Sequence, residues 1–179
     1  MSSPLSSFVG QALTWVPTAT FKDRYDLIAA DGTPLAILDM SNWTSKANAH
    51  VPEGTLFLHK EGWSGLKVTV STVGQGPLIA TFKRKWTGAT GQLLFPDGRE
   101  FKWAKLNFWG TQKGWTEPTG GPPYIQFSSG SFTRKLRAEI QPHATEIPEL
   151  SLLLVLGLYN VIVERRTAAA TAASTAGSV

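Results

Sequence analysis

The stretch that decides the fold is "IPELSLLLVLGLYNVIVERR", residues 147–166. It has no charged residue between Glu149 and Glu164, and its apolar run, 150–163, is 14 residues long. A helix of that length rises about 21 Å, whereas a membrane span needs about 20 apolar residues to cross ~30 Å of hydrocarbon. The length therefore favours a helix that is buried inside protein.

The residues at both ends of this run are typical of helix boundaries. Pro148 suits the first helical position, and Glu149 lies at the positive end of the helix dipole. Arg165 and Arg166 lie at the negative end. The sequence thus predicts a helix over about 148–164. Its leucines and valine occupy the whole circumference, so the helix must be enclosed on every side by protein or lipid.

Composition indicates one globular domain. The chain has 179 residues, of which 42% are hydrophobic and 17% charged, and no cysteine, which excludes disulfides and thiolate chemistry. Residues 1–13 lack the basic and apolar regions of a signal peptide and are expected to form a flexible leader, which favours a cytoplasmic protein. Residues 14–166 form the predicted domain. The low-complexity segment 167–179 is expected to be a disordered tail.

The sequence before the helix is typical of short antiparallel strands. Two apolar runs flank Asp31-Gly32, and two more flank Asp97-Gly98, which predicts two β-hairpins. In "LRAEI", residues 136–140, apolar and charged side chains alternate, as in a strand with one buried and one solvated face. Further strands are predicted at 55–60, 66–72, 77–86, 106–110, 123–129 and 133–142.

About ten strands followed by one wholly apolar helix indicate a mainly β architecture. An antiparallel sheet that closes on itself removes its exposed edges. A closed barrel with this number of strands has a lumen too wide to remain empty. The sequence therefore predicts a closed antiparallel β-barrel around a buried hydrophobic C-terminal helix.

Three stretches also carry a family resemblance: "DGREFKW" (97–103), "TRKLRAEIQP" (133–142) and the terminal apolar helix. Over roughly 14–166 the chain resembles the tubby C-terminal-like superfamily, which includes phospholipid scramblases and LURP-one-related proteins, and looks most like its small uncharacterised members. The resemblance implies a closed antiparallel barrel around a C-terminal helix. Tubby domains bind phosphoinositides and scramblases act at membranes, but no lipid-contact motif maps onto this chain, and the cysteine-rich stretch of scramblases is absent.

No motif points to an enzyme. His50, His59 and His143 lack metal-ligand spacing, and "GWSGLK" (62–67) is not a nucleophile elbow. "GQGP" (74–77) lacks the lysine and the flanking elements of a phosphate loop. The chain is therefore predicted to be non-enzymatic, with no metal or cofactor. No helix is free to enter a nucleic-acid groove, so nucleic acid is not an expected partner.

Positive charge is concentrated in the second half of the chain. Residues 1–74 carry five Lys or Arg against six Asp or Glu, whereas 75–166 carry twelve against seven. Strand alternation sends Lys83, Lys85, Lys135 and Arg137 outward, which makes them candidates for binding anionic lipid. The simpler interpretation is an ordinary solvated strand face.

Seven tryptophans raise the alternative of a membrane-interface role. Trp86 and Trp103 have inward parity and are expected to pack in the barrel. Trp43, Trp63 and Trp115 lie among Gly, Ser and Thr and are expected in exposed loops.

Two functional hypotheses follow. In the first, the protein is a binding module that contacts anionic phospholipid headgroups or a protein partner through its second half, peripheral to a membrane in the lipid case. In the alternative, it is a membrane-anchored, scramblase-like protein that uses 150–163 as a short anchor. The sequence does not indicate an oligomeric state.

Overall fold

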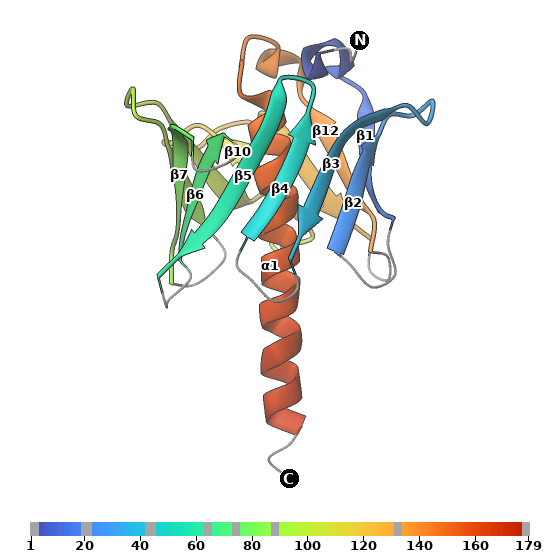
Figure 1. Ribbon diagram of the computed structural model, residues 1–179. Helices are drawn as coiled ribbons and strands as arrows, with labels where there is room; N and C mark the ends of the chain where they lie inside the picture. The colour runs from blue at the N-terminus through green and yellow to red at the C-terminus, as the bar shows by residue number, and fades with distance from the viewer. Residues whose placement is uncertain are drawn as a thin grey trace.

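The computed structural model describes residues 4–18, 23–41, 46–62, 66–72, 76–86, 90–130 and 134–176. Within these ranges the chain forms twelve strands and one long C-terminal helix, with two short 3-10 helices (Figure 1). In chain order the elements are η1 (Leu5–Phe8), β1 (Ala12–Pro17), β2 (Asp23–Ile28), β3 (Pro34–Met40), β4 (Lys46–Val51), β5 (Gly54–Glu61), β6 (Lys67–Thr72), β7 (Leu78–Arg84), β8 (Gly91–Leu94), β9 (Glu100–Lys105), β10 (Gln112–Thr116), β11 (Ile125–Ser129), β12 (Leu136–Ile140), η2 (Pro142–Ala144) and α1 (Leu150–Ala176).

The strands form one closed antiparallel barrel. Each strand pairs with its neighbour in sequence, and β12 closes the sheet by pairing with β1, Trp15 lying opposite Leu136. Both predicted hairpins are present, β2–β3 and β8–β9. Gly32 and Gly98 have φ values of 87° and 88° in their turns, a conformation that glycine adopts without a steric penalty. The predicted fold class, a mainly β closed barrel around the C-terminal helix, is confirmed.

Helix α1 fills the barrel. It runs along the axis and continues beyond the strands at one end (Figure 1). Leu153, Leu154, Leu156 and Leu158 are all 0% exposed, which confirms that the apolar run forms the core. The strands therefore enclose the segment that the anchor hypothesis would place in lipid. Among the described residues, no helix combines the length and the apolar content needed to cross a bilayer.

The barrel has two distinct ends because successive strands alternate in direction. We call the end where α1 begins the far end, and the end where it leaves the strands the exit end. The connections after β1, β3, β5, β7, β9 and β11 join strands at the exit end. The connections after the even-numbered strands join them at the far end.

Two segments near the ends of the chain have more regular structure than expected. Leu5, in the predicted leader, is 1% exposed, and β1 begins at Ala12. Helix α1 does not end near residue 164 but continues to Ala176, through most of the segment that was expected to be disordered. Alanine has the highest helix propensity, which outweighs the Thr and Ser in this segment.

The strand predictions were wrong in four places. Strands β1, β4 and β10 were not predicted, and 106–110, predicted as a strand, forms bends and turns. In β4 the inward positions are Ala47 and Ala49, which bury little apolar surface and so give a weak alternation signal. In β10 the sequence contains a glycine, Gly114, and glycine is typical of loops. A Cβ there would lie 2.4 Å from the carbonyl oxygen of Ile125, so the close strand approach requires glycine.

Candidate functional site at the exit end of the barrel

Exposed aromatic side chains gather on two adjoining connections at the exit end. Trp86 follows β7 and is 87% exposed, while Phe108 and Trp109 follow β9 and are 89% and 82% exposed. The rings of Phe108 and Trp109 meet edge to face, with centroids 5.3 Å apart. Because β7 and β9 are separated only by β8, these connections lie about 10 Å apart along the barrel wall.

Two lysines accompany these aromatic residues. Lys85 directly precedes Trp86 and is exposed. Lys105 ends β9, and its side chain lies over the turn at Gly110, where the φ of 68° favours glycine. We call the set Lys85, Trp86, Lys105, Phe108 and Trp109 the exit rim.

The four basic residues predicted from sequence do not form one patch. All of them are exposed, as expected, but Lys83 and Lys85 belong to β7 and its connection, whereas Lys135 directly precedes β12 and Arg137 lies on it. The two strands are five positions apart in the sheet order, or about 24 Å along the wall. Among the four, Lys85 alone directly precedes one of the described exposed aromatic residues.

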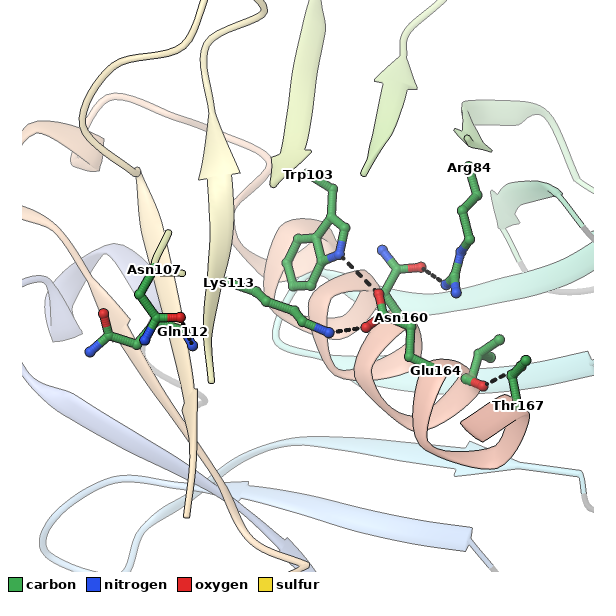
Figure 2. Close-up of polar contacts among 9 residues, drawn as sticks. Arg84, Trp103, Asn107, Gln112, Lys113, Asn160, Glu164 and Thr167 are labelled. Atoms are coloured by element: carbon green, nitrogen blue, oxygen red, sulfur yellow. Dashed lines mark hydrogen bonds and ion pairs between the residues drawn. The ribbon is translucent and has the colours of Figure 1, made fainter. Parts of the chain in front are cut away.

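A second group of polar side chains lies inside the barrel mouth, between the strands and α1 (Figure 2). The ammonium of Lys113 on β10 contacts the carboxylate of Glu164 on α1. Trp103 Nε1 donates a hydrogen bond of 3.4 Å to the other Glu164 oxygen, and Arg84 donates one of 2.9 Å to Asn160 Oδ1. We call Arg84, Trp103, Lys113, Asn160 and Glu164 the mouth cluster.

Strand geometry explains why these polar residues face inward. Side chains alternate along β10, so Lys113 shares the inner face with the fully buried Trp115, and it lies opposite Lys105 on β9. The side chains of Lys113 and Glu164 are 16% and 17% exposed. They therefore occupy the last layer of the lumen, where the apolar core gives way to solvent.

The mouth holds more positive than negative charge. Burial, followed by repulsion from Lys105, Arg84 and Arg165, lowers the pKa of Lys113 to about 8, although the carboxylate of Glu164 opposes this shift. Burial also lowers the pKa of Arg84. Among the described residues, no carboxylate lies within 4.0 Å of Arg84, Lys105 or Arg165. Several cations thus surround the carboxylate of Glu164.

A cavity of about 280 Å³ opens beside the mouth cluster, between α1 and strands β10, β11 and β12. Its polar lining comes from Lys113, Glu164 and Arg165 and from the hydroxyl-bearing residues Thr111 and Ser129. Its apolar lining is Phe127, Leu136 and Val161, with Gly110 and Ala168 completing it.

Sequence reasoning placed only part of this end correctly. Trp103 is fully buried, as predicted, but Trp86 is exposed because β7 ends at Arg84 and strand parity no longer applies beyond it. Trp115 was expected in an exposed loop and is 0% exposed, because it lies on the unpredicted strand β10. Trp43 and Trp63 lie outside the described residues. The mouth cluster was missed; the charged "ERR" at 164–166, directly after the apolar run, was its one sequence signal.

Comparison with known proteins gave no relative: no family model, curated protein or solved structure matched the chain. The resemblance to the tubby C-terminal-like superfamily therefore remains a prediction from the residues. Within the described part of the chain, no three His, Asp or Glu residues are grouped so that they could hold a metal ion.

Proposed function

We propose that this protein is a non-enzymatic binding module that docks the exit end of its barrel onto an anionic membrane surface. The observation that carries the proposal is the exit rim, where Trp86, Phe108 and Trp109 stand exposed beside Lys85 and Lys105. Tryptophan is enriched at membrane–water interfaces, where its ring meets the headgroups. A lysine near an anionic membrane surface contributes about 1 kcal/mol of attraction.

The contrast between the two ends supports this orientation. Of the described large hydrophobic side chains that are exposed, three lie on the exit rim, and the fourth, Leu78 at 51%, begins β7 at the far end. Exposed apolar groups that gather in one region mark interaction surfaces.

The part of α1 outside the barrel is compatible with the same orientation. We call residues 167–176 the stalk; it extends about 15 Å beyond Arg166 and has no charged side chain. The hydroxyls of Thr167 and Thr171 donate to the carbonyls of Val163 and Thr167, at 2.9 and 3.0 Å, and Ser174 donates to Thr171 at 2.8 Å. Hydroxyls that are already bonded to the helix lower the cost of placing the stalk among lipid headgroups.

Vesicle sedimentation tests the proposal. The wild-type protein should sediment with vesicles of phosphatidylcholine mixed with phosphatidylserine, but not with phosphatidylcholine alone. Binding should weaken as salt rises, because the field of the surface decays over about 8–10 Å at physiological ionic strength. Failure to bind the anionic vesicles even at low salt would refute lipid docking and leave the exit rim as a surface for a protein partner.

Variants locate the binding surface. The double change Lys85→Glu and Lys105→Glu removes at least about 2 kcal/mol of attraction and should weaken binding by about 30-fold or more. The triple change Trp86→Ser, Phe108→Ser and Trp109→Ser should also abolish sedimentation without changing the melting temperature, because these side chains are exposed.

A matched control uses the same charge reversal away from the exit rim. Lys83→Glu with Arg137→Glu alters two exposed residues on the barrel wall, five strands apart. This variant should bind anionic vesicles nearly as well as the wild type. If it instead loses binding as fully as the rim variant, the surface lies on the wall or the attraction depends on net charge alone.

A further inference from the structure

The cavity between α1 and strands β10 to β12 has a lining that suits an anionic group. Lys113 and Arg165 present an ammonium and a guanidinium to it from opposite elements, a strand and the helix. Thr111 and Ser129 add hydroxyls from the ends of the neighbouring strands. An arginine has five N–H donors, and Arg165 uses one of them in a long bond of 3.4 Å to the carbonyl of Arg134. Donors therefore remain for a ligand.

The charge of the surroundings favours the same ligand class. Arg84 and Lys105 lie close enough to Lys113 to lower its pKa, and among the described residues that line the cavity Glu164 is the only one with a carboxylate. Cations that lie this close together repel one another, and a bound anion relieves that repulsion. Phosphate carries close to two negative charges and three acceptor oxygens, so it matches a lysine and an arginine together better than a carboxylate does.

We propose that this cavity binds a phosphate monoester, with Lys113 and Arg165 as its charged ligands and Thr111 and Ser129 as hydroxyl donors. The volume of about 280 Å³ is slightly below the usual range for small-molecule pockets, about 300–1,000 Å³, and suits a headgroup-sized ligand. The phosphate group belongs either to a free metabolite or to a membrane lipid. The lipid source rests on the proposed docking of the exit end, whereas the site itself does not.

The proposal also predicts that a change at Glu164 strengthens phosphate binding, whereas changes at Lys113 and Arg165 weaken it. Its carboxylate lines the cavity and holds the ammonium of Lys113, so it competes with an incoming phosphate. Trp103 Nε1 donates to the other Glu164 oxygen, which keeps the side chain in place. Glu164→Gln removes the competing charge while preserving shape, and it should strengthen phosphate binding several-fold.

The first test uses inorganic phosphate and follows its ³¹P line width as protein is added, at ionic strength fixed with sodium chloride. The wild type should broaden the signal saturably. Lys113→Met and Arg165→Gln should each weaken binding by tenfold or more. Arg165 is partly exposed, so its variant is informative even if Lys113→Met folds poorly. A matched control is Lys102→Met, since Lys102 is on the outer face of β9 and outside the cavity lining.

Two results would overturn the site. One is a wild-type protein that does not saturate with phosphate; the other is a loss in Lys102→Met as large as that in Lys113→Met. Glu164→Gln binding more weakly than the wild type would also contradict the assigned geometry.

The second test separates the two sources of phosphate. Vesicles containing phosphatidic acid present a monoester, whereas phosphatidylglycerol presents a diester. If the ligand is a lipid headgroup, the wild type should prefer phosphatidic acid, and Lys113→Met should lose that preference. Saturable binding of inorganic phosphate without any such preference assigns the site to a free phosphate compound.

The triple aromatic variant of the exit rim keeps the two proposals distinguishable. It should lose vesicle binding while it binds inorganic phosphate as the wild type does. If the rim variant retains vesicle binding and the phosphate site is confirmed, the docking proposal alone fails. If vesicles bind through the exit rim and phosphate does not saturate, the phosphate site alone fails.

Discussion

The inner part of α1 and the stalk are both helical, but they differ in burial and in what stabilises the helix. From Leu150 to Ile162 the side chains are buried, and Leu153 and Leu154 are 0% exposed. From Thr167 to Ser174 they are exposed. The inner part is helical because the barrel encloses its apolar surface, whereas the stalk is helical because of the high helix propensity of its alanines. A continuous helix can therefore rest on two unrelated sources of stability.

The boundary between the two parts is where charge appears. Glu164 contacts Lys113 of β10, and Arg166 contacts Asp23 of β2, so the helix is tied to two strands that lie four positions apart around the barrel as it leaves. The apolar part forms the core of the barrel, and the charged residues at the boundary belong to the candidate site.

The largest expected effect comes from charging the inner part. Leu154→Asp places a carboxylate in the filled lumen, with a burial cost of several kcal/mol that is comparable with a total stability of about 5–15 kcal/mol. The protein should be unfolded or insoluble, as measured by circular dichroism and soluble yield. The matched change in the stalk, Ala170→Asp, should leave both unchanged. Soluble Leu154→Asp protein with the wild-type melting temperature would mean that the helix does not form the core.

The same contrast explains how much of the fold could be predicted from sequence. The apolar run is too short to cross a membrane and has no polar face, so protein has to enclose it. The barrel around α1 could therefore be predicted from residues 147–166 together with the strand alternation. Two of the three missed strands have weak side-chain signals. In β4 the inward residues are Ala47 and Ala49, and in β10 Gly114 is required by a contact that only the folded sheet creates.

The candidate site could not be predicted because it depends on where strands end. Strand alternation predicted that Trp86 points inward, yet β7 ends two residues before it and its side chain is exposed. Lys113 faces inward only because it shares a strand face with Trp115, and that strand was not recognised. Which basic residues lie close together depends on the order of strands around the barrel, which no local pattern reveals.

A smaller effect is expected from a single methyl group in the inner part. A Cβ on Gly157 would lie 2.2 Å from the Phe127 ring, so Gly157→Ala overpacks the core at a cost of about 1–3 kcal/mol. On helix propensity alone the same change would stabilise by up to about 1 kcal/mol. Urea unfolding should show a net loss. Adding Phe127→Leu, which withdraws the ring, should recover part of it; a stabilised Gly157→Ala single variant would contradict the close contact.

The boundary should give a pH-dependent effect that is smaller still. Because the pKa of Lys113 falls from 10.5 to about 8 on folding, the unfolded chain holds this proton more tightly and the protonated form opposes folding. That opposition is complete below pH 8 and is relieved between about pH 8 and 10.5. The unfolding free energy of the wild type, relative to Lys113→Met, should therefore rise across this window. A fall in this difference as the pH rises would contradict the lowered pKa of Lys113.

The smallest effect is expected from removing the stalk. Ending the chain at Arg166, by deletion of 167–179, removes exposed side chains from the described helix and leaves every fully buried residue of the core in place. Arg165 and Arg166 would then occupy the last turn, where positive charge favours the negative end of the helix dipole. The melting temperature should be unchanged within error, and a clear fall would show that the stalk docks on the barrel. Vesicle binding in the same variant sharpens the contrast: the exit rim is intact, so binding should persist, and its loss would move the membrane contact from the rim to the stalk.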